Sequence, residues 1–345
     1  MARALALAAA LALAPLAARA GAATPEAVTP ALVSAAQADG KVVFYTAIDI
    51  TVATQIAKSF EAAYPDITVQ VERNGGERIA QRLAQERQAN IFAVDVLASS
   101  DTAQFITWKR QGWLTPFVPA EVAAKWPAEQ RDAEGYFANE RFTLMPIAYN
   151  TRLVKPADAP KSFADLLDPK WAGKIVKAHP GYSGGIVTST FETSRALGWG
   201  YFERLGRQRV MQVQSATEPP KKLALGERAL EADGLEYVLI HMQERGDPVA
   251  IVYPAEGTPL ITGSVALADK APHPSAARLF ISFLFSRRRQ QLMCDAGGMR
   301  SFHPDVTLKA GRTRLAEIKL LPADAEAQER ETESLKQKYA EYFGT

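Results

Sequence analysis

The N-terminal half of the chain alternates between short apolar runs and segments whose apolar residues recur at helical spacing. Runs rich in β-branched and aromatic residues predict strands at 41–47, 67–71 and 94–98. The segments after the first two strands place apolar residues on one helix face: Val52, Ile56, Phe60, Ile79 and Leu83. Strands that alternate with helices through short connections are typical of an α/β fold with a doubly wound, mainly parallel sheet.

A second α/β pattern is inserted into the first. Two extended apolar segments, 142–150 and 248–254, bracket a stretch with a predicted strand at 174–178 and a predicted helix at 186–197. We therefore expect two lobes joined by two hinge segments. The predicted lobes are residues 41–147 plus 252–345, and residues 148–251.

Residues 1–20 have the pattern of a secretory signal peptide. Arg3 precedes an apolar run of alanine and leucine, and Ala18-Arg19-Ala20 is a small-x-small cleavage signal. The apolar run is too short to span a bilayer well. We expect export and cleavage after Ala20.

Charge and cysteine content exclude several classes of protein. Removing residues 1–20 removes Arg3 and Arg19 but no acid, which leaves 38 basic and 38 acidic residues. A neutral chain lacks the excess of positive charge that nucleic-acid binding needs. A single cysteine, Cys294, excludes an intrachain disulfide, and the histidines lack zinc-site spacing. We expect no nucleic-acid partner, no cofactor and a monomer.

Polar loops follow the predicted strands of the first lobe, at 46–50, 73–77 and 99–101. The carboxyl ends of strands in a doubly wound sheet are where ligands bind. These loops present Asp49, Ser99 and Ser100 as candidate ligand contacts.

In the second lobe, Ser183-Gly184-Gly185 stands between a predicted strand and a predicted helix. Free N–H groups at a helix start, a serine hydroxyl and glycines that allow close approach favour an anion. The alternative is an ordinary serine cap with glycines that serve the turn. We expect residues 183–185 and 233–237 to face the first-lobe loops across a cleft.

The order of several motifs resembles a known family. Between Lys41 and His303 the chain carries KVVFYTA, NGGERIAQRLAQE, VDVLASSD, PIAYNT, PKWAGKI, PGYSGG, VYPAEGTPL and HPSAARLFISFLFSRRRQQ. This order resembles the periplasmic solute-binding proteins of ABC importers, in the branch of ferric-iron-binding proteins and their relatives for organic or phosphorylated anions and thiamine. The resemblance implies a two-lobed, type II-like fold that closes on a ligand without catalysis. It also implies a periplasmic location and delivery of the ligand to an ABC permease in the inner membrane.

The chain departs from the iron-binding members at the expected metal site. Those proteins carry two adjacent tyrosines at a helix start in the second lobe, where this chain has Glu236 and Tyr237. They often present a histidine in the first-lobe loop that here contains Asp49. Carboxylate and phenolate oxygens suit a hard cation, so Asp49, Glu236 and Tyr237 are the expected ligands if the solute is Fe³⁺.

We favour a small organic or phosphorylated anion over Fe³⁺ or a thiamine-like ligand, because half of the usual iron ligands are missing. The predicted ligand-binding residues are Ser183, Gly184, Gly185, Ser99, Ser100, Asp49, Asp233, Glu236 and Tyr237.

A hypothesis of a different class is a secreted esterase-like serine hydrolase. Gly181–Gly185 spells G-x-S-x-G between a strand and a helix, the setting of a hydrolase nucleophile. Ser183 would then need an acid and a downstream histidine, for which His241, His273 and His303 are candidates. No HGGG-like oxyanion loop precedes the motif. We therefore expect a binding protein and no enzyme.

Overall fold

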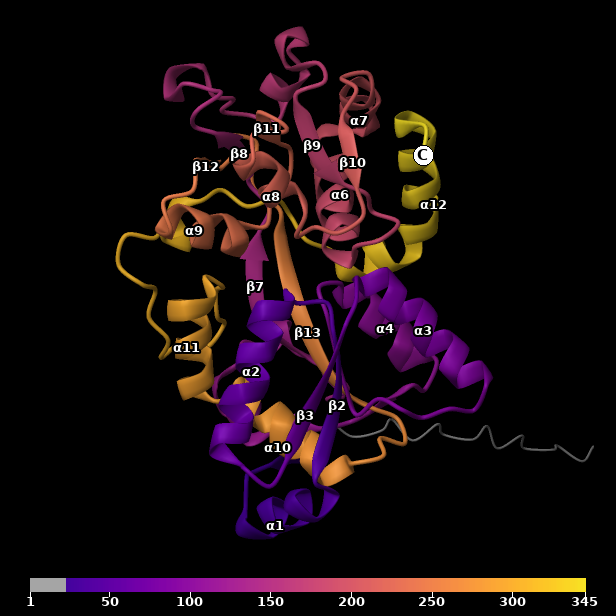
Figure 1. Cartoon of the computed structure of the whole chain (residues 1–345). Coiled ribbons are helices and arrows are strands. Elements are labelled where there is room, and N and C mark those ends of the chain that lie inside the picture. The colour runs from indigo at the N-terminus through magenta and orange to yellow at the C-terminus, as the bar shows by residue number, and fades with distance from the viewer. Residues whose placement is uncertain (1–22) are drawn as a thin grey trace, which may run out of the picture.

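The computed structural model describes residues 23–345, which form two α/β lobes, each built on its own sheet (Figure 1). The predicted two-lobed fold is confirmed. The predicted signal peptide, residues 1–20, lies outside the described residues.

The sheet of the first lobe has the strand order β3-β2-β4-β13-β5, and β7 also pairs with β13. The strands are β2 (Lys41–Thr46), β3 (Thr68–Arg73), β4 (Val96–Ser99), β5 (Leu114–Thr115), β7 (Ala138–Leu144) and β13 (Leu260–Ala268). β2 pairs in parallel with β3 and β4, as predicted. β13 pairs antiparallel with β4, β5 and β7, because it enters from the second lobe at the carboxyl end of β4. The sheet is therefore mixed, and the mainly parallel pairing that the sequence predicts holds only for its first strands.

Helices cover both faces of this sheet, as alternate residues of β2 require. Val42 and Phe44 belong to one buried cluster, and Val43 and Tyr45 to another on the opposite face. The helices of this lobe are α1 (Pro30–Asp39), α2 (Ile50–Ala63), α3 (Gly76–Gln88), α4 (Thr102–Arg110), α5 (Ala120–Lys125), α10 (Pro274–Phe285) and α11 (Arg287–Gly297). The predicted inner faces of α2 and α3 are buried.

The sheet of the second lobe is also mixed, with the order β10-β9-β11-β8-β12. β9 pairs in parallel with β10 and β11, and β8 pairs antiparallel with β11 and β12. The strands are β8 (Ile147–Asn150), β9 (Ile175–Ala178), β10 (Met211–Val213), β11 (Leu230–Glu231) and β12 (Val249–Val252). The helices are α6 (Gly184–Leu197), α7 (Trp199–Gly206), α8 (Pro219–Ala224) and α9 (Glu236–Glu244).

Two chain segments connect the sheets, one between β7 and β8 and one between β12 and β13. The C-terminal helix α12 (Ala325–Phe343) packs against α4 of the first lobe and against α6 and α7 of the second (Figure 1). Gln328 joins the lobes, since its amide nitrogen donates to Asp101 at 2.9 Å and to Thr188 at 3.1 Å. α12 therefore contacts both lobes, whereas the predicted division assigns it to the first alone.

Short elements complete the described chain. β1 (Pro25–Glu26) pairs in parallel with β6 (Val118–Pro119). Single 3₁₀ turns occur at Ala128–Gln130, Pro156–Asp158, Ala164–Leu167, Pro169–Trp171 and Leu315–Glu317. None of the helices within residues 23–345 has the length and hydropathy that a membrane span requires.

Candidate functional site

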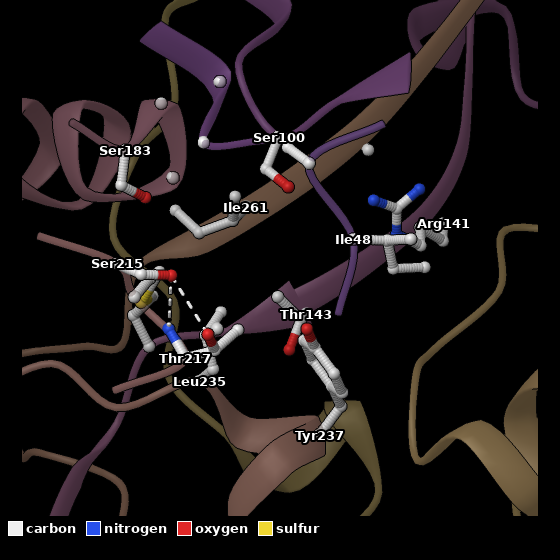
Figure 2. A pocket seen from close by; sticks show the side chains of 18 of the residues that line it. Ile48, Ser100, Arg141, Thr143, Ser183, Ser215, Thr217, Leu235, Tyr237 and Ile261 are labelled. Carbon is white, nitrogen blue, oxygen red and sulfur yellow. Dashed lines mark hydrogen bonds between the residues drawn. The ribbon is translucent and has the colours of Figure 1, made fainter. Parts of the chain in front are cut away.

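A cavity of about 40 Å³ lies between the lobes, where the carboxyl ends of β2, β3 and β4 face that of β9. Figure 2 shows its wall, to which both lobes contribute side chains. The first lobe contributes Ala47, Ile48, Arg73, Gly75, Gly76, Ser100, Arg141, Thr143, Met145, Ile261, Gly263 and Met299. The second lobe contributes Tyr182, Ser183, Gly184, Gly185, Ser215, Ala216, Thr217, Leu235 and Tyr237.

The start of α6 forms one part of the wall. Ser183 is the N-cap residue, yet its side chain makes no capping hydrogen bond. Its carbonyl oxygen accepts the N–H groups of Ile186 and Val187, both at 3.0 Å. The N–H groups of Gly184 and Gly185 belong to the first turn, which has no acceptors within the helix. The Ser183 hydroxyl is therefore not used as an ordinary cap.

The start of α3 meets the start of α6 across the cleft. A Cβ atom added to Gly75 would lie 2.3 Å from the carbonyl oxygen of Tyr182. One added to Gly76 would lie 3.3 Å from the backbone nitrogen of Gly184, and one added to Gly184 would lie 2.7 Å from Cβ of Asp101. Only glycine allows such an approach of backbone to backbone. The two helix starts are therefore in contact at the cavity.

Positive charge enters the cavity from the first lobe. Arg73 donates from Nε to the carbonyl oxygen of Ile48 at 3.2 Å and from Nη2 to Ser215 Oγ at 3.4 Å. In the described part of the chain Arg73 forms no ion pair, and the cavity lining includes Arg141 but no aspartate or glutamate. Helix N-termini carry a partial positive charge. The cavity lining in residues 23–345 therefore carries two guanidinium groups and no carboxylate.

Hydroxyl groups line the side of the cavity formed by β7 and α9. Burial, followed by the nearby Asp49 carboxylate, raises the pKa of Tyr237 to about 12, although Arg141 and Arg73 act in the opposite direction. The phenol is therefore protonated at neutral pH and can donate a hydrogen bond. Thr143 is also buried, and its hydroxyl has no hydrogen-bond partner among residues 23–345.

Residues 47–291 match the family of bacterial extracellular solute-binding proteins. The chain belongs to this family. The predicted role as a solute-binding protein is thereby confirmed.

Two relatives, one of them named for a ligand, are similar to this solute-binding protein over most of its length. It is 26% identical over 278 residues to a probable ABC transporter periplasmic-binding protein of Sinorhizobium fredii, covering 77% of this chain and 75% of that one. It is 28% identical over 251 residues to a putative 2-aminoethylphosphonate-binding periplasmic protein of Salmonella typhimurium, covering 70% of this chain and 71% of that one.

Two solved structures show the same fold. The fructose-6-phosphate-bound periplasmic binding protein AfuA of Actinobacillus pleuropneumoniae aligns with a TM-score of 0.81 at 22% identity, covering 88% of this chain and 99% of that one. Iron-bound HitA of Pseudomonas aeruginosa aligns with a TM-score of 0.74 at 19% identity, covering 87% of this chain and 99% of that one.

The structure brings five of the predicted ligand-binding residues of this solute-binding protein to the cavity wall: Ser100, Ser183, Gly184, Gly185 and Tyr237. Ser99 is fully buried behind the wall, and its hydroxyl lies 2.8 Å from the position of a Cβ atom on Gly76. Asp49 caps α2, where its carboxylate accepts the Thr51 N–H at 2.9 Å. Ser99 and Asp49 are therefore close to the cavity but do not line it.

Asp233 and Glu236 are absent from the cavity lining and are held in buried ion pairs. The Lys177 ammonium donates to Asp233 at 2.5 Å. Arg300 donates to both carboxylate oxygens of Glu236 at 2.9 Å, and the Tyr253 hydroxyl donates to one of them at 2.6 Å. These carboxylates are committed to partners within the protein and do not line the cavity.

The structure does not bring the three predicted Fe³⁺ ligands together at the cavity, since Asp49 lies near Tyr237 but caps α2, and Glu236 is paired with Arg300. Tyr237 alone lines the cavity, and its raised pKa makes the phenolate form costly at neutral pH. Within residues 23–345 no group of three histidine, cysteine, aspartate or glutamate side chains is arranged to hold a metal ion.

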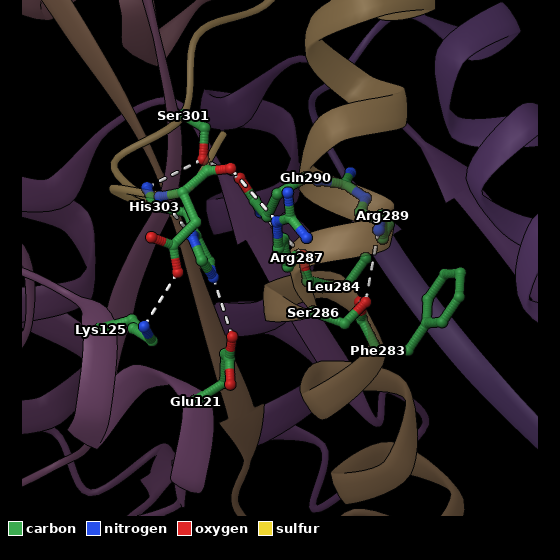
Figure 3. Close-up of polar contacts among 11 residues, drawn as sticks. Glu121, Lys125, Phe283, Leu284, Ser286, Arg287, Arg289, Gln290, Ser301 and His303 are labelled. Carbon is green, nitrogen blue, oxygen red and sulfur yellow. Dashed lines mark hydrogen bonds and ion pairs between the residues drawn. The ribbon is translucent and has the colours of Figure 1, made fainter. Parts of the chain in front are cut away.

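The histidines are not arranged to activate Ser183. His179 accepts the Gly181 N–H at 2.9 Å and bonds Thr345 at 2.8 Å. His273 is paired with Asp95 at 2.9 Å and His303 with Glu121 at 2.8 Å, the latter contact being visible in Figure 3. No hydrogen bond joins Ser183 to any histidine among the described residues, His241 included.

The sequence analysis includes Arg73 in a candidate ligand-binding loop, 73–77, without selecting it as a ligand contact, and it misses Arg141 and Thr143. Arg73 ends a parallel strand, the position at which ligand contacts are expected. Arg141 and Thr143 are two residues apart on a strand whose residues are all buried, so both face the same side of the sheet. Polar residues at this spacing in a buried strand are a signal that could have identified them.

Proposed function

We propose that this solute-binding protein captures a small oxyanion between its lobes and delivers it to an ABC permease. The observation that carries this proposal is a cavity lined by Arg73 and Arg141, with no carboxylate in its wall. The starts of α3 and α6 add backbone N–H donors. Ser183 adds a hydroxyl that makes no capping hydrogen bond to the N–H groups of α6. Arginine is well suited to planar or tetrahedral oxyanions.

A cationic solute fits this cavity poorly. Two guanidinium groups would repel Fe³⁺ or a thiamine-like ring, and the desolvated site would strengthen that repulsion. The relative named for 2-aminoethylphosphonate and the solved complex with fructose 6-phosphate both have oxyanion ligands, which supports the same class here.

Ligand binding would close the lobes about the two connecting segments. A ligand favours the closed form only through contacts that it makes better there, which requires contacts to both lobes. We propose the lobes 41–147 plus 252–345 and 148–251, with α12 packed against both. Ser183 and Arg73 belong to different lobes and would meet the same anion.

The remaining parts of the proposal concern export and activity. The protein would be secreted to the periplasm with cleavage after Ala20, and would act there as a monomer without enzymatic activity or a nucleic-acid partner. Intact-mass analysis of a periplasmic extract tests the cleavage, and detection of Arg3 in the mature chain would contradict it. Hydrolysis of a p-nitrophenyl ester that is lost in Ser183→Ala would revive the hydrolase hypothesis.

Calorimetric titration of the mature protein tests the ligand class. Inorganic phosphate, sulfate, phosphonates and sugar phosphates are compared with Fe³⁺ and thiamine, and small-angle scattering follows closure. We expect binding and compaction with at least one oxyanion and with neither cation. Tight binding of Fe³⁺ or thiamine, without binding of any oxyanion, would overturn the proposal.

A further inference from the structure

The cavity has two polar ends. Figure 2 shows Ser183 and Ser100 at one end and Thr143 and Tyr237 at the other, with Ile261 between them. The first end contains the helix starts on which the proposed function depends. The second end is not needed to bind a single oxyanion.

Sheet register directs Arg141 and Thr143 to this second end. In the β7–β13 ladder Arg141 is opposite Gly263, and Thr143 is opposite Ile261. A Cβ atom on Gly263 would lie 2.5 Å from the guanidinium carbon of Arg141. Glycine at this position therefore leaves the space in which the Arg141 guanidinium lies along the sheet.

The charge on Arg141 is not fully compensated. Its ion-pair partner is Glu140, and the other oxygen of the same carboxylate lies 3.1 Å from Arg289 Nη1. All three side chains are buried, and in the described residues Arg289 has no other ion pair. Two buried cations thus share one buried anion. An uncompensated buried charge is costly, and a negative group of a ligand would relieve that cost.

The neutral groups at this end are hydrogen-bond donors. Thr143 is 8% exposed and lines the cavity, and its hydroxyl has no hydrogen-bond partner in the part of the chain that the structure describes. The protonated Tyr237 hydroxyl lies in the same wall. Asp49, the nearby acid, caps α2 and does not line the cavity. Among residues 23–345 no carboxylate lines this wall, so an ammonium group would have no anion to pair with there.

We propose that the ligand is two-headed, with one oxyanion at the starts of α3 and α6 and a second anionic or strongly accepting group, such as a carboxylate, at Arg141, Thr143 and Tyr237. A short apolar spacer would lie beside Ile261. This inference rests on the proposed oxyanion function and adds the class of the second group. It separates the protein from binders of phosphonates that carry an ammonium group.

Three probes with the same phosphonate head test the second end: phosphonoacetate, ethylphosphonate and 2-aminoethylphosphonate. We expect phosphonoacetate to bind at least tenfold more tightly than ethylphosphonate, and 2-aminoethylphosphonate to bind most weakly. Equal affinities, or a preference for the ammonium, would overturn the two-headed ligand while leaving the oxyanion function intact. If none of the three probes binds while another oxyanion does, the two-headed ligand is overturned and the oxyanion function stands. Failure of every oxyanion tested, sulfate and sugar phosphates included, would overturn both proposals.

Variants assign the preference to the second end. Arg141→Gln should reduce the preference for phosphonoacetate over ethylphosphonate to less than threefold, and Thr143→Val should reduce it by a smaller factor. Ser183→Ala is the matched control, because it should weaken both probes by the same factor. Thr143→Val keeps the test decisive if Arg141→Gln does not fold. An unchanged preference in a folded variant of either residue would contradict the assignment.

Discussion

The two lobes contribute different chemistry to the same cavity. The first lobe supplies the formal charges, Arg73 and Arg141, together with the glycine start of α3. The second lobe supplies neutral donors, namely the start of α6 and the hydroxyls of Ser183, Ser215, Thr217 and Tyr237. Charge acts over a longer range than a hydrogen bond, whereas a hydrogen bond requires close and directional contact.

This difference indicates an order of events. An anion would first meet the arginines of the open first lobe, and closure would then bring the donors of the second lobe to it. Variants of the first-lobe charges should therefore weaken anion binding the most. Variants of the second-lobe donors should weaken the closed form to a smaller extent.

The largest effect is expected for Arg73→Ala. A hydrogen bond to a charged group contributes about 1.5–3 kcal/mol, so anion affinity should fall by roughly 10- to 100-fold. Calorimetry measures the loss. Arg78→Ala is the matched control, because Arg78 also reaches the other lobe, at Gln214, but does not line the cavity. Equal losses in the two variants would show that Arg73 acts only as a contact between lobes.

A second prediction concerns closure itself. In Gly75→Ala the added methyl group would collide with the Tyr182 carbonyl oxygen of the other lobe, so the lobes could not close fully. We expect at least tenfold weaker binding and no compaction in small-angle scattering, with the Tm of the ligand-free protein unchanged or slightly raised. Gly200→Ala is the control, since a Cβ atom there meets nothing within 4 Å. Normal compaction of Gly75→Ala would contradict this closed arrangement.

A smaller effect is expected for the second-lobe hydroxyl. Ser183→Ala should weaken binding by about three- to tenfold, the contribution of an ordinary hydrogen bond, and should leave Tm unchanged because the hydroxyl caps nothing. Ser286→Ala should do the reverse. That serine caps α11 by accepting the Arg289 N–H, so its loss should cost about 1 kcal/mol of stability without changing affinity. A drop in Tm for Ser183→Ala would show instead that the Ser183 hydroxyl acts as an ordinary N-cap of α6.

The smallest predicted effect is a pH dependence. Burial, followed by Glu77, raises the pKa of Asp101 to about 7, while Lys336 acts in the opposite direction. Above this pH a negative charge appears beside Gly184, so anion affinity should fall by a few-fold as pH rises through about 7. The same raised pKa favours the folded state at low pH, and that stability is lost as pH rises to about 7.

Asp101→Asn separates this group from the titration of the ligand. The ratio of variant to wild-type affinity cancels the ionisation of the ligand and should increase with pH. An amide oxygen can still accept the Gln328 bond that Asp101 makes at 2.9 Å. A ratio that does not change with pH would exclude Asp101 as the titrating group.

Much of the fold could be predicted from local pattern. The periodicities in β2, α2 and α3 predict the buried faces that the structure shows, because each depends on residues close in sequence. The direction of β13 could not be predicted in this way. It depends on the end of the sheet at which the chain returns from the second lobe, and this reverses its pairing with β4.

The sequence by itself determined the family, the two α/β units and the helix start at Ser183-Gly184-Gly185, since strand, turn and helix there are specified by adjacent residues. Only the tertiary structure decided which charges are free to bind a ligand. Asp233 and Glu236 lie within four residues of Tyr237 in sequence, but they form buried ion pairs with Lys177 and Arg300. In the described residues Arg73 has no carboxylate partner, and Arg141 must share Glu140 with Arg289. The pairing of a buried charge depends on segments far apart in the chain, which meet only when the lobes have folded.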